Sequence, residues 1–173
     1  MDIVDFDLSK HFTLYELTVT SNKTLQEANR DAAVRYIPSL KALAEQILEP
    51  IRGDRPLKIN SAFRSAELNN ATIGSSPTSQ HPLGQAADIH RPGQSSEDLF
   101  AEILGLFKSR GIKFGQLINE SAQRDYGLVS WVHVSLGRDF WKPERCGEVL
   151  RKWDDKDGKP HFELVEKVKQ EVA

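Results

Sequence analysis

Cysteine is almost absent from this chain of 173 residues, in which Cys146 is the single one. One thiol permits no internal disulfide and excludes a structural zinc site built from several cysteines. Basic residues are not in excess either, since 23 Lys and Arg stand against 25 Asp and Glu, for a formal net charge of −2. Nucleic-acid binding depends on clustered basic side chains, so we expect no nucleic acid as the main partner.

The sequence also lacks a polybasic membrane anchor and a secretory signal. Its first seven residues, Met1 to Asp7, are acidic where a signal peptide would be basic and then apolar. We therefore expect no membrane insertion and a protein that is made and kept in a reducing cytoplasm. We also expect a monomer.

Hydrophobic residues make up 39% of the chain, which is enough for one domain with a substantial core. Apolar side chains with a 3.6-residue period predict helices over 38–52 and 96–110. Pro50 and Gly53 are predicted to stop the first helix, and Ser95 is a candidate N-cap for the second.

Short β-rich runs predict four or five strands interleaved with these helices, among them 57–63, 86–90, 114–120 and 129–135, and the tail over 147–165 is predicted to contain a hairpin turn. The runs 114–120 and 129–135 are expected to pair antiparallel, joined by a polar connection over 121–128. Together the elements indicate an α+β fold, a single domain with a mainly antiparallel sheet and helices packed on one face. Residues 1–28 show little periodicity and are predicted to form an N-terminal arm packed on the domain formed by 29–173.

His81 and Asp88 are the first candidate metal ligands. On a helix, seven residues would separate them by about 10 Å along the axis, too far for one ion. Pro82 and Gly84 oppose a helix, and residues 86–90 alternate as a strand does. The pattern predicts a loop that turns back at Gly84 and places His81 beside Asp88 on the following strand.

His133 is the candidate third ligand, on one face of the predicted strand over 131–135. Two imidazoles and a carboxylate, with one position left for water, are typical of a catalytic zinc site. His90 competes for a ligand role, but it would share a strand face with Asp88 at about 6.6 Å, too far for one ion, so a supporting role stays open for it. Each histidine alone is more simply a core or surface residue, and only their joint spacing favours zinc.

Three segments resemble the signature blocks of the M15 peptidases, the zinc D-Ala-D-Ala carboxypeptidase and L,D-endopeptidase group: 61–65, 79–89 and 131–135. Two others, 11–17 and 116–120, resemble a branch common in phage and prophage genomes. The resemblance implies a hedgehog-like or DD-peptidase-like fold, a zinc cofactor held by His81, Asp88 and His133, and cleavage of peptidoglycan stem peptides. A cytoplasmic protein would then reach its substrate on lysis or in a virion.

Arg64 follows the predicted strand over 57–63, at a turn where side chains are presented rather than buried. Taken alone it is more simply a surface charge. The resemblance implies a substrate-binding role, in which its guanidinium binds a substrate carboxylate in two parallel hydrogen bonds. Ser79 is expected to add a hydroxyl donor to the same group.

The general base is where the sequence departs from the family pattern. Many relatives place Asp or Glu three residues before the last histidine, and here that position is Ser130. Glu120, at the end of the strand expected to neighbour His133, is the predicted catalytic base, with Asp125 as its alternative. The departure also leaves open a non-catalytic phage structural or wall-binding module, and less readily a purely structural zinc domain.

Overall fold

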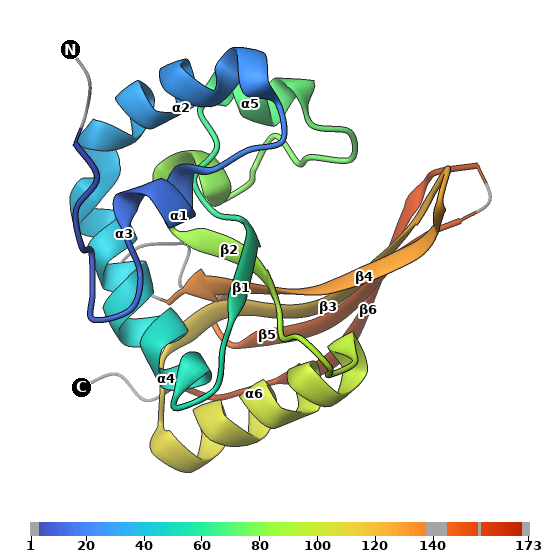
Figure 1. The fold of residues 1–173 in the computed structure, drawn as a ribbon. Helices are drawn as coiled ribbons and strands as arrows, with labels where there is room; N and C mark the ends of the chain where they lie inside the picture. Colours follow the sequence, from blue (N-terminus) through green and yellow to red (C-terminus); the bar gives the residue numbers. More distant parts are fainter. Residues whose placement is uncertain (1–3, 138–144, 156, 171–173) are drawn as a thin grey trace.

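The computed structural model describes residues 4–137, 145–155 and 157–170. A six-stranded sheet crosses it in the order β1-β2-β4-β3-β5-β6 (Figure 1). The strands are β1 (Lys58–Ser61), β2 (Ala86–His90), β3 (Phe114–Arg124), β4 (Gly127–Leu136), β5 (Glu148–Asp154) and β6 (Pro160–Lys167). All neighbouring strands pair antiparallel except β3 and β5, which are parallel. The predicted α+β fold is confirmed.

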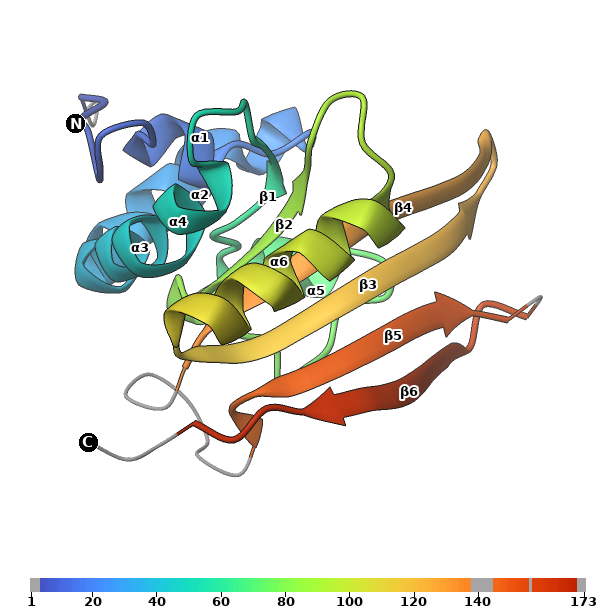
Figure 2. The ribbon, with the colours of Figure 1, turned by 90° about the horizontal axis from the view of Figure 1, so that it is seen from below.

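The helices are α1 (Leu14–Thr18), α2 (Gln26–Ala33), α3 (Ile37–Leu43), α4 (Glu49–Arg52), α5 (Ala66–Ala71) and α6 (Ser96–Arg110). Helix α6 lies across β3 and β4, while α5 stands on the far side of the sheet (Figure 2). Apolar side chains of the sheet, such as Ile89 and Val132, join α3, α4 and α6 in one buried core. The alternate side chains of β2 and β4 therefore face the opposite side, where the candidate ligands lie.

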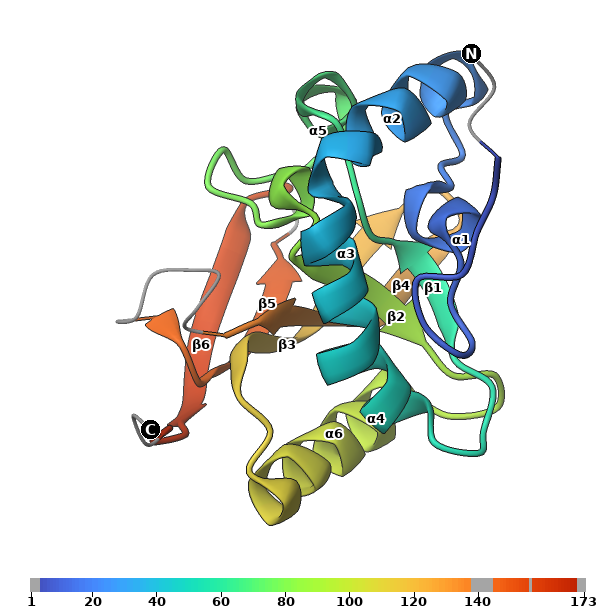
Figure 3. The same cartoon turned by 90° about the vertical axis from the view of Figure 1, so that its left-hand side faces the viewer.

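The predicted helix over 38–52 exists, but Pro50 does not stop it. Between α3 and α4 the chain makes a π-helical turn (Ala44–Leu48), in which the Glu49 N–H bonds to the Ala44 carbonyl, five residues back. This wider turn accommodates a proline, whose ring and missing N–H oppose a regular α-helix. The helix ends at Gly53, which has a φ of +52°. In Figure 3 the continuous segment crosses the front of the molecule.

The connection predicted over 121–128 is wrong, because most of it is strand. β3 runs to Arg124 and β4 begins at Gly127, and these two residues are paired. This outer part of the hairpin extends beyond α6 (Figure 1), where polar and apolar side chains, Gln123 and Leu128 among them, are exposed alike and hide the strand pattern. The hairpin predicted over 147–165 is present as the antiparallel pair of β5 and β6.

The first residues of the chain are more helical than their weak periodicity indicates. Helix α2 is short and mostly polar, which explains why no apolar stripe marks it. Three apolar side chains anchor the preceding segment in the core: Phe12, Leu14 and Leu17. The division of the chain at residue 28 stays a prediction. Within the part of the chain that the structure describes, no helix combines the length and apolar character needed to cross a membrane.

Candidate metal centre and substrate cleft

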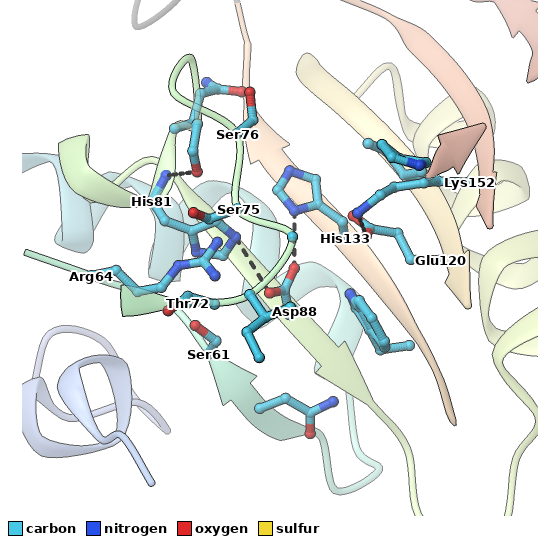
Figure 4. A pocket seen from close by; sticks show the side chains of 18 of the residues that line it. Ser61, Arg64, Thr72, Ser75, Ser76, His81, Asp88, Glu120, His133 and Lys152 are labelled. Carbon is cyan, nitrogen blue, oxygen red and sulfur yellow. Dashed lines mark hydrogen bonds and ion pairs between the residues drawn. The ribbon is translucent and has the colours of Figure 1, made fainter. Parts of the chain in front are cut away.

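His81, Asp88 and His133 converge on the face of the sheet opposite α6 (Figure 4). Asp88 of β2 lies directly opposite His133 of β4 in the antiparallel register. His81 arrives from a short 3-10 turn (His81–Leu83) that precedes β2. One ligand atom from each of the three residues lies within 4.8 Å of the others.

Gly84 turns the chain back toward the sheet, as its place in the sequence predicts. Its φ is +66°, and a Cβ there would lie 3.1 Å from Leu40 Cγ and 3.2 Å from Tyr36 Cβ. A side chain would therefore be strained in both conformation and space. The turn is closed by the Gly84 N–H, which bonds to the His81 carbonyl at 3.1 Å, and by the Gln85 N–H, which bonds to the Gln80 carbonyl at 3.2 Å.

The His81 ring is buried and oriented by the backbone. Its Nδ1 lies 2.6 Å from the Ala62 carbonyl oxygen, which can only accept, so Nδ1 carries the proton and donates. The other ring nitrogen, Nε2, is left facing Asp88, with 3.4 Å between Nε2 and Oδ2. A carbonyl that fixes the tautomer of a histidine is the usual support of a metal ligand.

The separations between the imidazoles and Asp88, each to a different carboxylate oxygen, are close to those expected between two ligands of one ion. Two ligand atoms at zinc bond lengths are separated by roughly 3.3 Å, and the pairs here measure 3.4 Å (His81 Nε2 to Asp88 Oδ2) and 3.0 Å (His133 Nδ1 to Asp88 Oδ1). Burial lowers the pKa of His81, and the Asp88 carboxylate offsets part of that shift. Burial alone would raise the pKa of Asp88, but His81 and His133 hold it well below its usual range. A neutral imidazole and an ionised carboxylate are the forms that bind metal, so the donor set fits zinc.

His90 lies outside this group. Its Nδ1 is 2.5 Å from Asn60 Oδ1, and the side chain is exposed at the end of β2. Among the residues with described positions, His81, Asp88 and His133 form the one cluster of three potential ligands.

Arg64 lies beside the ligands, at the predicted turn between β1 and α5. Its backbone N–H bonds to the His81 carbonyl oxygen at 3.4 Å, and its side chain lines the cleft. Burial lowers the pKa of its guanidinium, while the Asp88 and Glu120 carboxylates raise it. Its Nε is buried and has no hydrogen-bond partner among the described residues.

Asn29 fixes this turn, a role that no sequence motif indicates. It is fully buried on α2, and its Nδ2 donates to the Thr18 carbonyl at 2.7 Å and the Phe63 carbonyl at 3.2 Å. Its Oδ1 accepts from the Ser65 N–H at 2.7 Å. Asn29 thus holds the backbone on both sides of Arg64. A buried amide far along the chain carries no local signal, so only contact information reveals it.

Ser79 lies in the loop that leads to His81 and lines the same cleft. Its Oγ accepts from the His81 backbone N–H at 3.2 Å. The hydroxyl proton is still able to donate elsewhere, because the bond to His81 uses only a lone pair.

Glu120 lines the cleft on β3, two strands from Asp88. Lys152, which no sequence motif indicates, lies beside it on β5, and its Nζ donates to Glu120 Oε2 at 2.8 Å. Both side chains are largely buried, with 16% of Lys152 and 10% of Glu120 exposed. Asp125 lies in the exposed turn between β3 and β4, and Ser130 is exposed and outside this cleft.

The cleft has a volume of about 690 Å³, within the usual range for a binding site. On one side of the ligands it is lined by β1, Arg64 and the polar loop 72–80, and on the other by β3, β5 and β6.

The amino-acid sequence was compared with curated proteins and with protein-family models. No curated protein sequence matches the chain. A family model described as Peptidase M15 matches residues 10–123, which include Arg64, His81, Asp88 and Glu120. His133 follows the matched segment by ten residues. Because the match covers more than half of the 173 residues, this chain belongs to the peptidase M15 family, whose members are hydrolases of peptide bonds.

Proposed function

We propose that this protein is a zinc peptidase that cuts a peptide bond in the stem peptides of bacterial peptidoglycan. The observation that carries the proposal is the convergence of two imidazoles and one carboxylate in a cleft of a peptidase-family fold. His81, Asp88 and His133 would hold the ion. Zinc, when bound, supplies Lewis acidity at the scissile carbonyl and makes water acidic enough to attack near neutral pH.

Glu120 is proposed as the general base. It accepts the proton of the attacking water and passes it to the leaving amine. Lys152 bonds to Oε2 of Glu120 and thereby restricts how the carboxylate can turn. Asp125 is a poorer candidate because it lies in an exposed turn outside the cleft.

Arg64 and Ser79 are proposed to bind a substrate carboxylate close to the cut bond. The place of Arg64 on the cleft beside Asp88 supports this role, since its guanidinium can donate charge-assisted hydrogen bonds to a carboxylate bound there. Ser79 would donate its hydroxyl proton to the same group. A free or side-chain carboxylate near the bond is therefore a requirement for the substrate.

Incubation of the purified protein with peptidoglycan, with and without a chelator, tests the proposal. We expect amino groups to be released at a rate that the chelator abolishes and that added zinc restores. Metal analysis of the same preparations should give one zinc per chain. Release that is insensitive to chelator, or a preparation without zinc affinity, would refute it.

The alternative is a non-catalytic phage structural or wall-binding module that keeps the fold and the metal. Ser130 favours it, because a carboxylate is common at that position in relatives. The same incubation separates the two, since a binding module would sediment with peptidoglycan and release no amino groups. Either protein would act after lysis or as part of a virion, and is proposed to be a monomer.

A further inference from the structure

The hairpin of β5 and β6 builds a wall of the cleft that the family match does not reach. It spans 148–167, whereas the match stops at residue 123. Four of its side chains line the same cleft as the candidate ligands: Lys152, Asp154, Pro160 and Phe162. This part of the cleft is therefore the place where the chain can set a selectivity of its own.

A row of paired residues leads from β4 to this wall. Trp131 of β4 pairs with Glu120 of β3, and Glu120 pairs with Lys152 of β5. Lys152 in turn pairs with Phe162 of β6. Strands are spaced by about 4.8 Å, so the three steps from β4 to β6 cover about 14 Å. An extended peptide rises about 3.3 Å per residue, and a substrate cut beside His133 would reach β6 with about its fourth residue.

The row ends in an exposed apolar pair. Phe162 is 58% exposed, and Leu164, on the same face of β6, is 60% exposed. β6 is an edge strand, and Lys152 Nζ lies 6.0 Å from the centre of the Phe162 ring. Covering such a pair with an apolar group releases free energy. Since Phe162 continues the lining of the cleft, the substrate's own chain is the occupant that can reach it while bound at the metal centre.

We propose that Phe162, with Leu164 beside it, is a remote subsite that binds an apolar side chain of the peptide about four residues from the cut bond. The inference rests on the proposed peptidase function and deepens it. It makes long peptides with an apolar residue at that distance better ligands than short or polar ones. Phe162 is then a specificity-determining residue, with no part in the chemistry.

Calorimetry on the zinc-loaded Glu120→Gln variant tests binding without turnover. The probes are a stem tetrapeptide and the same peptide extended at either end by Gly-Gly-Leu or Gly-Gly-Ser. At one of the two ends, we expect the Leu-extended peptide to bind about tenfold more tightly than the Ser-extended peptide. A gain of this size is expected when a leucine side chain buries part of its apolar surface. Adding Phe162→Ala should remove that preference. Trp153→Ala is the matched control, because Trp153 is on the same hairpin, is 42% exposed and does not line the cleft.

The outcomes separate the subsite from the proposed function. If the protein without these substitutions cleaves stem peptides but the Leu preference is absent or survives Phe162→Ala, the subsite is wrong and the function stands. If nothing is cleaved while the Leu preference is present and lost in Phe162→Ala, the function is wrong and the peptide subsite stands. If Phe162→Ala instead dissolves a dimer seen by sedimentation and leaves peptide binding unchanged, the pair serves self-association and the subsite is overturned.

Discussion

The two walls of the cleft position their side chains by different means. The arginine wall, residues 61–81, consists of helix α5 between an irregular turn and a loop, and the turn is held by the buried side chain of Asn29 and by the bond from the Arg64 N–H to the His81 carbonyl. The hairpin wall, formed by β5 and β6, holds Lys152 and Phe162 as directly paired residues of a strand ladder. Irregular backbone must be fixed by particular buried polar groups, whereas a ladder fixes every residue on it. We therefore expect substitutions in the arginine wall to lower the stability of the fold, and substitutions in the hairpin wall to change which peptides bind.

The largest effect should come from the centre that both walls share. Asp88→Ala removes the carboxylate that touches both imidazoles, so we expect loss of zinc and of all measurable cleavage. Metal analysis beside the peptidoglycan assay measures both. His90→Ala is the control and should keep one zinc per chain. Retention of zinc by Asp88→Ala would move the site to other residues.

Glu120→Gln comes next, because it joins the centre to the hairpin wall. It should keep zinc and lose about 10²–10⁴-fold in kcat, the usual contribution of acid–base catalysis. Asp125→Asn, in the exposed turn, should stay within about twofold of the parent, as expected of a group outside the chemistry. The reverse order of effects would assign the base to Asp125.

Asn29→Ala tests the arginine wall directly. It leaves the Thr18 and Phe63 carbonyls and the Ser65 N–H without their buried partner. We expect the free energy of unfolding to fall by about 2–4 kcal/mol in urea titrations, since each unpaired buried group costs about 1–3 kcal/mol. Asn70→Ala, an exposed asparagine on α5, should change it by under about 0.5 kcal/mol. Equal effects would mean that the wall does not depend on this network.

The smallest effect is expected far from both walls, at Glu102 on α6. Burial alone would raise the pKa of this carboxyl, but bonds from Gln94, Arg55 and Arg91 lower it from its usual 4.5 to about 2. A pKa below the unfolded value adds stability above pH 4.5, and that stability is lost as the pH falls toward 2. Glu102→Gln should therefore be less stable than the parent at pH 7 and nearly equal to it near pH 2. Urea titrations at several pH values measure this, and cleavage should be unchanged at pH 7.

Some of this architecture is visible in local pattern and some is not. The helix over 96–110 begins at a capping serine and ends at a glycine with a φ of +62°, so its limits are local properties. The first long helix passes Pro50 through a π-helical turn, which the apolar stripe does not reveal. The outer hairpin of β3 and β4 is missed because it lies beyond the core, where burial no longer imposes alternation.

The sequence by itself determined the three candidate ligands, because a turn at Gly84 and the two-residue period of strands restrict which side chains can meet His81. It also determined the place of Arg64, since a strand followed by a capping serine leaves one residue at the turn between them. Only the tertiary structure decided that Asn29 fixes that turn and that Lys152 reaches Glu120. Those contacts join elements 36 and 32 residues apart, and their partners are chosen by sheet order and core packing, which no local pattern encodes.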